Sequence, residues 1–101
     1  MNERQFQFEW DEVKASFNVQ KHGVSFETAA TIFYDLRILT VPDEKHSEVE
    51  ERWFSIGAVS NGVLLSIVYV WQELSPVTTK IRLISARKAT RSEARYYEDN
   101  L

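Results

Sequence analysis

The dipeptide Asn61-Gly62 separates two β-rich runs, and it constrains the fold of this chain more than any other feature. The runs cover residues 52–60 (RWFSIGAVS) and 63–72 (VLLSIVYVWQ). Asn-Gly between two such runs is the strongest short-range signal for a β-hairpin, and it predicts a type I′ turn. The second half of the chain is therefore expected to contain an antiparallel sheet.

Three further runs extend this hairpin into a larger sheet. Residues 37–41 (RILTV) precede Pro42, which ends a strand, and residues 78–86 (TTKIRLISA) alternate charged with apolar side chains. Near the N-terminus, residues 6–10 (FQFEW) alternate aromatic with polar side chains. This period of two predicts another short strand with one buried face.

The residues after this first strand predict a hairpin of two helices. Asp11 is a suitable N-cap for the first helix, which carries Val13 and Phe17 on adjacent turns. Gly23 suits the C′ position at its end, and Ser25 is a suitable cap for the second helix. The second helix has an apolar stripe at i, i+3, i+4 and i+7, made by Phe26, Ala29, Ala30 and Phe33.

A third helix is expected over residues 91–99 (RSEARYYED), opened by Thr90 or Ser92. The predicted order is β-α-α-β-β-β-β-α, which gives an α+β fold. In this fold a twisted antiparallel sheet is backed by the N-terminal helical hairpin and by the C-terminal helix. A length of 101 residues favours a single domain over residues 1–101.

Composition excludes several kinds of site. The chain has no cysteine, which excludes disulfide scaffolds, cysteine-bound zinc and thiol catalysis. His22 and His46 are the only histidines, so a multi-histidine metal site is excluded as well. His46 lies in an acidic segment beside Glu48, Glu50 and Glu51, but one imidazole on such a segment makes a poor metal site. We therefore expect neither a metal nor a cofactor.

Two further observations bear on location and partners. No apolar run is long enough to span a membrane, and the N-terminus lacks the features of a signal peptide, so we expect a cytoplasmic protein without membrane contact. The net charge of −3 argues against unspecific binding of nucleic acid. The cationic side chains are nevertheless concentrated in residues 78–101, which indicates one surface that meets polyanions.

The strand predicted over residues 78–86 carries the main candidate site. Lys80 and Arg82 are expected to share one face, away from the buried side chains of Ile81 and Leu83. Arg87 and Lys88 follow at the end of the strand, where we expect exposed side chains. Guanidinium groups on a rigid strand can bind phosphate oxygens in a bidentate manner and can stabilise charge that develops on phosphorus. The alternative is a solvated strand face paired with acidic side chains.

Other candidates have two interpretations each. His22 could act as an acid or a base, or it could simply place positive charge at the end of a helix. Glu51 could act as a base or could pair with Arg52. Tyr96 and Tyr97 could stack on a nucleobase or could pack the last helix against the domain.

Four segments, taken together, resemble the BrnT family of toxins from bacterial type II toxin–antitoxin systems. They are FEWD (Phe8–Asp11), KHGVSFETA (Lys21–Ala29), HSEVEER (His46–Arg52) and IRLISARKAT (Ile81–Thr90). The resemblance implies a RelE-like fold and a ribonuclease that inhibits translation and arrests growth. It also implies a BrnA-like antitoxin that has a ribbon-helix-helix DNA-binding domain, neutralises the toxin in a 2:2 heterotetramer and connects it to operator DNA.

The resemblance also implies the roles of individual residues. Arg82 and Arg87 are expected to hold the scissile phosphate, Lys88 or Glu51 to take a proton, and Arg52 to position the RNA. His22 is a further catalytic candidate, and the residues expected to contact RNA are Lys21, Lys80, Arg91 and Tyr97. The resulting hypothesis is a metal-independent endoribonuclease. The alternative is a non-catalytic binding module that only supports an antitoxin–operator repressor complex.

Overall fold

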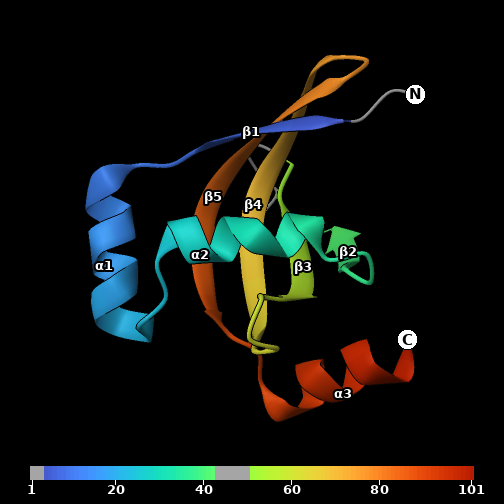
Figure 1. Cartoon of the computed structure of the whole chain (residues 1–101). Helices are drawn as coiled ribbons and strands as arrows, with labels where there is room; N and C mark the ends of the chain where they lie inside the picture. Colours follow the sequence, from blue (N-terminus) through green and yellow to red (C-terminus); the bar gives the residue numbers. More distant parts are fainter. Residues whose placement is uncertain (1–3, 43–50) are drawn as a thin grey trace.

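The computed structural model describes residues 4–42 and 51–101, in which a five-stranded sheet is combined with three α-helices (Figure 1). The order of elements confirms the predicted β-α-α-β-β-β-β-α succession and the α+β class. The elements are β1 (Gln5–Glu9), α1 (Glu12–His22), α2 (Phe26–Ala30), the 3₁₀-helix η1 (Thr31–Tyr34), β2 (Leu39–Pro42), β3 (Trp53–Ala58), β4 (Leu64–Ser75), β5 (Thr78–Lys88) and α3 (Arg91–Asp99).

The strands lie in the order β1-β5-β4-β3-β2, so the first and last strands of the chain are neighbours. Strands β2 to β5 form the expected antiparallel meander. Strand β1, in contrast, pairs with β5 in parallel, so the sheet is mixed rather than wholly antiparallel. Alternation of side chains predicts a strand and its buried face but carries no information on strand direction, which is why this pairing could not be predicted.

The hairpin at Asn61-Gly62 is confirmed, but its predicted type I′ turn is wrong. A type I′ turn requires a positive φ at both central residues. Gly62 has a φ of 86°, whereas no described residue other than glycine has a positive φ. The N–H of Gly62 donates to the carbonyl of Val59 at 2.8 Å, and the N–H of Val59 donates to the carbonyl of Val63 at 3.0 Å. The connection is therefore a three-residue loop in which the glycine alone adopts the left-handed conformation.

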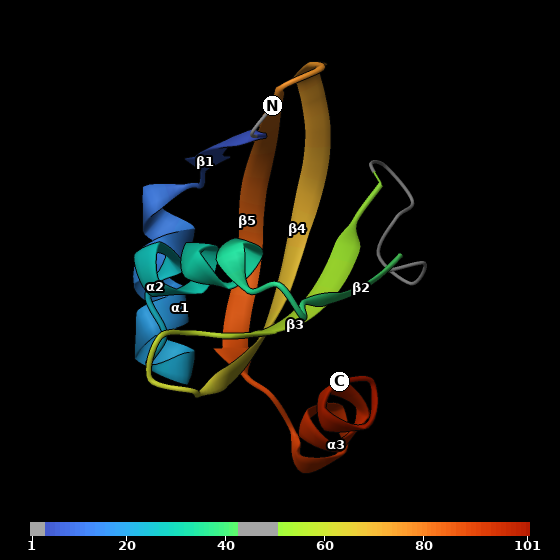
Figure 2. The ribbon, with the colours of Figure 1, turned by 45° about the vertical axis from the view of Figure 1, so that its right-hand side comes forward.

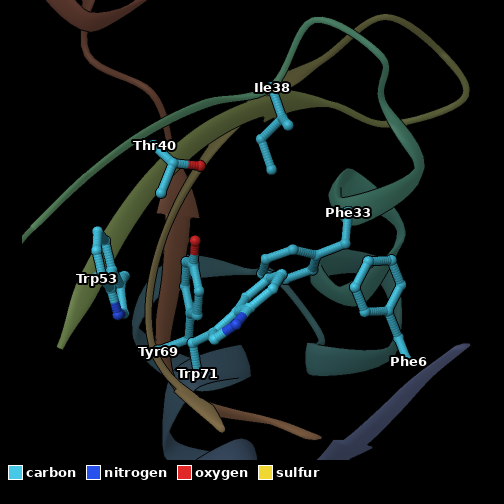
Figure 3. A pocket seen from close by; sticks show the side chains of 7 residues that line it. All are labelled: Phe6, Phe33, Ile38, Thr40, Trp53, Tyr69 and Trp71. Atoms are coloured by element: carbon cyan, nitrogen blue, oxygen red, sulfur yellow. The ribbon is translucent and has the colours of Figure 1, made fainter. Parts of the chain in front are cut away.

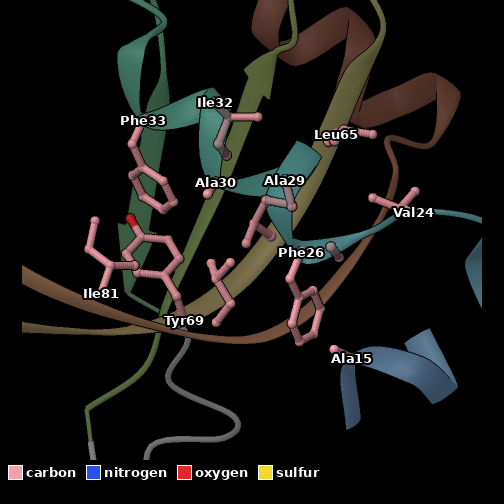
Figure 4. Packing of buried hydrophobic residues seen from close by; sticks show 13 residues of the cluster. Ala15, Val24, Phe26, Ala29, Ala30, Ile32, Phe33, Leu65, Tyr69 and Ile81 are labelled. Atoms are coloured by element: carbon pink, nitrogen blue, oxygen red, sulfur yellow. The ribbon is translucent and has the colours of Figure 1, made fainter. Parts of the chain in front are cut away.

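The helix α1, the helix α2 and η1 lie on one face of the sheet, called here the covered face. All four residues of the predicted stripe on the second helix are buried, and they pack with Tyr69 of β4 and Ile81 of β5 (Figure 4). The rings of Phe33 and Tyr69 meet edge to face, with centroids 4.8 Å apart. Gly57 of β3 lies directly beneath Ile32, where an added Cβ would come within 2.8 Å of the isoleucine Cβ. A side chain at position 57 would therefore push η1 away from the sheet.

The helix α1 docks differently from the prediction. Val13 and Phe17 are each 65% exposed, whereas Ala15 and Asn18 face the sheet and are buried. The amide group of Asn18 donates to the carbonyls of Val24 (2.9 Å) and Ala86 (2.8 Å), and its oxygen accepts from the N–H of Ala86 at 3.1 Å. Because a polar side chain makes this contact, the pattern of apolar residues gave the wrong face.

The helix ends follow the predicted chemistry. Asp11 and Ser25 accept hydrogen bonds as N-caps of α1 and α2, and Gly23 ends α1 with a φ of 68°. Thr90 opens α3 through a capping box with Glu93. These caps set the lengths of the helices and hold the segments between them in place.

The opposite face of the sheet, called here the open face, is only partly covered by α3. Figure 2 shows α1 and α2 to one side of β4 and β5, with α3 on the other side near one end of these strands. A β-bulge in β5 decides which side chains reach this face. The register passes from Val68–Ser85 to Tyr69–Leu83, so Ile84 is an extra residue. Without it Arg82 would share a face with Lys88; with it Arg82 shares a face with Arg87.

Candidate active site

Apart from Arg91 and Tyr97, which belong to α3, the residues proposed from the sequence lie in three separate parts of the structure. Lys80, Arg82 and Arg87 lie on the open face. Lys21, His22 and Lys88 belong to the end of the molecule where α1 meets α2. Glu51 and Arg52 directly precede β3. Only the first set lies together on a rigid sheet surface.

A cleft of about 230 Å³ on the open face is lined by the charged side chains of Glu9, Lys80 and Arg82. The Nζ of Lys80 is 3.5 Å from the Oε1 of Glu9, and Glu9 lies directly opposite Arg82 in the register of β1 and β5. Arg82 is exposed, and within residues 4–42 and 51–101 it forms no ion pair. Its guanidinium group is thus available to an anion in the cleft. The lining residues are Glu9, Val70, Gln72, Lys80 and Arg82.

Arg52 directly precedes β3, which lies on the opposite side of β4 from Arg82. The last pair of the β3–β4 ladder is Trp53 with Tyr69, so Arg52 lies just outside this ladder. Val70, the next residue of β4, pairs on its other side with Arg82. Neighbouring strands lie about 4.8 Å apart, so the two arginines start roughly 10 Å apart. This spacing suits the two sides of an extended RNA backbone.

Arg87 is tied to α3 instead of being free at the end of its strand. Its guanidinium group donates to both carboxylate oxygens of Glu93, at 2.7 and 2.9 Å. The same carboxylate accepts from the hydroxyl of Ser66 (2.8 Å) and from the N–H of Thr90 (2.8 Å). The hydrogen bond from Arg87, helped by those from Thr90 and Ser66, lowers the pKa of Glu93 to about 2 despite partial burial. Arg87 therefore fixes the position of α3, in addition to any contact with a ligand.

Lys88 is separated from Arg82 and Arg87 by the sheet. It pairs with Leu65, which belongs to the covered face, and it lines a hollow together with Gly23 and Ser25. His22 is half-buried in the last turn of α1, just before Gly23, and Lys21 is exposed beside it. The expectation that Lys88 joins the arginines of the strand is thus wrong, and the bulge at Ile84 is the physical reason.

The tyrosines of α3 divide between the two interpretations. Tyr97 is buried, and its hydroxyl donates to Asp35 at 2.7 Å, so the expectation that Tyr97 stacks on RNA is wrong. Burial works to raise the pKa of Asp35, but hydrogen bonds from the N–H groups of Ala58 and Arg37 and from Tyr97 outweigh it and lower that pKa. Tyr96, in contrast, is 53% exposed.

Tyr96 borders an apolar groove of about 270 Å³ between α3 and strands β2 and β3. This groove continues the open face beyond the charged cleft, since Phe54 of the groove pairs with Val68, two residues from Val70. An apolar surface with one exposed ring is suited to a nucleobase. The other lining residues are Leu39, Val41, Ile56, Ser92 and Glu93. Arg91, at the start of α3, is exposed.

Another cavity, of about 310 Å³, lies on the covered face, and none of its lining residues within 4–42 and 51–101 is charged (Figure 3). The hydroxyl of Tyr69 bonds to Ser55 at 2.6 Å, and Ser55 bonds to Thr40 at 2.8 Å. With apolar rings and neutral hydroxyls as its walls, this cavity cannot hold a phosphate. The lining residues are Phe6, Phe33, Ile38, Thr40, Trp53, Tyr69 and Trp71.

Two residues of the open-face cleft, Glu9 and Gln72, were not predicted from the sequence. The alternation in FQFEW does place Glu9 on the polar face of its strand. Its proximity to Lys80 and Arg82, however, depends on the parallel pairing of β1 with β5. The only available signal was the charge of Glu9 at the end of a short strand.

The part of the chain that the structure describes contains no cluster of three or more His, Asp or Glu residues that could hold a metal ion. The metal site considered at His46, Glu48 and Glu50 lies outside the described residues, and Glu51, the next residue of that segment, is exposed. No helix in the described ranges is long and apolar enough to cross a membrane.

The sequence matches the profile of a family described as "Ribonuclease toxin, BrnT, of type II toxin-antitoxin system" over residues 10–93. The chain belongs to the BrnT family. It is thus a ribonuclease toxin of a type II system, and such a system pairs each toxin with an antitoxin. A comparison with curated proteins gives no match.

The fold is that of a solved BrnT structure. The crystal structure of the ribonuclease toxin BrnT of Brucella abortus superposes with a TM-score of 0.60. The aligned region covers 86% of this chain and 99% of the Brucella chain, at 22% sequence identity. The α+β architecture of this BrnT-family chain is therefore shared with that toxin.

Proposed function

We propose that this BrnT-family chain is a metal-independent endoribonuclease that cleaves RNA on the open face of its sheet. The observation that supports this most strongly is the cleft lined by Arg82 and Lys80 of β5 and by Glu9 of the neighbouring strand β1. Arg82 binds the scissile phosphate, Lys80 adds a second positive charge, and Arg52 holds the neighbouring backbone. Such fixed charges stabilise the additional negative charge that develops on phosphorus during cleavage.

Cleavage of cellular RNA in the cytoplasm by this single domain inhibits translation and arrests growth. A BrnA-like antitoxin with a ribbon-helix-helix domain binds the toxin in a 2:2 heterotetramer and connects it to operator DNA. Arg87 contacts the RNA from beside the cleft, and Arg91 and Tyr96 of α3 add contacts, whereas Lys21 lies where α1 meets α2 and is left out of this site. His22, Glu51 and Lys88 lie outside the cleft, so in this proposal they do not transfer protons.

The direct test incubates the purified chain with end-labelled RNA, with and without EDTA. We expect cleavage at the same rate in both samples, and arrest of growth when the chain is expressed without its antitoxin. Loss of cleavage in EDTA and its recovery with a divalent ion would contradict the metal-independent mechanism.

A second candidate function, a non-catalytic subunit of a repressor complex, is favoured by one observation. Two cations of the open face already pair with acids, Lys80 with Glu9 and Arg87 with Glu93. Wild-type protein that binds the antitoxin but leaves RNA intact and cells growing would establish this alternative.

A further inference from the structure

Among the residues that the structure describes, Glu9 is the single acidic side chain that lines the open-face cleft. A carboxylate in a cleft that binds RNA repels phosphate and weakens binding. Glu9 nevertheless lies beside the cations of this cleft, on the edge strand β1, opposite Arg82 and 3.5 Å from the Nζ of Lys80. Its side chain is 46% exposed, so one of its oxygens can meet a ligand while the other meets Lys80.

The position of Glu9 is held from both sides. On one side, Phe8 and Glu9 pair with Ile81 and Arg82 in the parallel ladder of β1 and β5. On the other, the ring of Trp10 packs against Phe26 with centroids 5.9 Å apart, and Asp11 caps α1. A side chain on such a rigid segment keeps its geometry through a reaction, which efficient proton transfer requires.

We propose that Glu9 is the general base of RNA cleavage and Lys80 the general acid, an inference that rests on the proposed function. Glu9 takes the proton of the ribose 2′-hydroxyl while the 2′-oxygen forms a bond to phosphorus. The bond from phosphorus to the 5′-oxygen breaks, and the 5′-oxygen takes a proton from Lys80. Arg82 balances the charge on the phosphorane. The products are a 2′,3′-cyclic phosphate and a 5′-hydroxyl.

The contact between Glu9 and Lys80 also completes the cycle. After cleavage Glu9 carries one proton more and Lys80 one proton fewer than before. A proton passes back across the 3.5 Å contact, or through one water, and restores both groups. The cycle therefore needs neither a metal ion nor another co-reactant.

The first test replaces Glu9 by glutamine, which keeps the shape of the side chain and removes its basicity. General-base catalysis contributes about 10² to 10⁴-fold, so kcat of Glu9→Gln should fall by about 100-fold or more. The KM for RNA should fall or stay the same, because one repelling charge is lost. Glu27→Gln, the same change at an exposed position on α2, should cleave at the parental rate.

The pH–rate profile separates catalysis from mere charge pairing. The charged groups around Glu9 are Lys80 and Arg82 on β5 and Asp11 at the start of α1. The wild-type rate should decline on the acid side, and this limb should be absent in Glu9→Gln. Glu9→Asp keeps a carboxylate and should retain the limb at a reduced rate, which provides a second variant should the glutamine variant fold poorly.

A substrate with a 5′-thio leaving group tests the acid. Sulfur leaves without a proton, so this substrate should restore cleavage by Lys80→Ala but not by Glu9→Gln. If wild-type protein fails to cleave RNA, the proposed function itself is wrong. If the wild type cleaves, Arg82→Ala does not, and Glu9→Gln cleaves at the parental rate with an unchanged pH profile, then only the assignment of Glu9 is wrong.

Discussion

On the covered face of the sheet, apolar side chains from α1, α2, η1, β4 and β5 fill one cluster, and the ring of Phe33 lies within 6.1 Å of those of Phe6, Phe8 and Tyr69. On the open face, charged side chains of β1 and β5 stand beside a cleft that remains accessible to solvent. The covered face stabilises the fold through burial of apolar side chains. The charged side chains of the open face act on a bound ligand instead. Substitutions on the two faces should therefore change different properties.

The largest effect on stability is expected from Phe33→Ala. The ring is nearly fully buried and contacts three other rings, so its loss should leave a cavity and cost about 3–5 kcal/mol of unfolding free energy. Urea unfolding followed by tryptophan fluorescence measures this change. The folded fraction of this variant should cleave RNA at the parental rate; a much slower folded fraction would show that the two faces are coupled.

The largest effect on activity is expected from Arg82→Ala. Removal of one preorganised donor to a developing negative charge costs about 10² to 10³-fold in rate, so RNA cleavage should fall by at least 100-fold. Because Arg82 is exposed, the melting temperature should remain close to that of the parent. Arg95→Ala, at an exposed position of α3, is the matched control. Parental cleavage by Arg82→Ala would exclude the phosphate site proposed on the open face.

A variant on α3, over the open face, Glu93→Gln, should affect stability in a pH-dependent way. The pKa of Glu93 is lowered from 4.5 to about 2, mainly by Arg87, so its ionised form stabilises the folded state above pH 4.5. This stabilisation is lost as the pH falls from 4.5 toward 2. At pH 7 we expect a cost of about 1–2 kcal/mol, because Arg87 is 37% exposed and solvent weakens the pair.

The measurement is a series of urea titrations between pH 3 and pH 7. The difference in stability between parent and variant should shrink steadily below pH 4.5. A difference that stays constant over this range would mean that the ion pair of Arg87 and Glu93 does not stabilise the fold.

The smallest effect is expected on the outer side of α1, at Phe17→Gln. The ring is 65% exposed, so the unfolding free energy should change by no more than about 0.5 kcal/mol. On the inner side of the same helix, Asn18→Ala removes three hydrogen bonds with buried backbone groups and should cost about 1–3 kcal/mol. Equal costs for the two variants would contradict the docking of α1 described above.

The sequence predicted the parts of the fold that depend on local pattern. The capping residues Asp11, Ser25 and Thr90, the stripe around Phe33 and the hairpin at Gly62 all act within a few residues. The orientation of α1 was mistaken because Asn18 contacts Ala86, 68 residues away, through hydrogen bonds that no hydropathy pattern reveals.

The candidate site was predicted less completely, because its composition depends on register. The choice of Lys80 and Arg82 needed only strand alternation, and the structure places both on one face. The loss of Lys88 from the site follows from one extra residue, Ile84, and the addition of Glu9 follows from the parallel pairing of the first and last strands. Neither a bulge nor a strand direction leaves a reliable mark in a single sequence.

The pairing of β1 with β5 also bears on how a cell makes this toxin. The ribosome adds Glu9 long before Arg82, so a nascent chain that has not reached β5 holds just one side of the cleft. Until Thr78–Lys88 has left the ribosome, β1 has no strand to pair with. Pairings so distant in sequence also form late in folding. A nascent chain from which Thr78–Lys88 has not yet emerged should thus be unable to cut RNA.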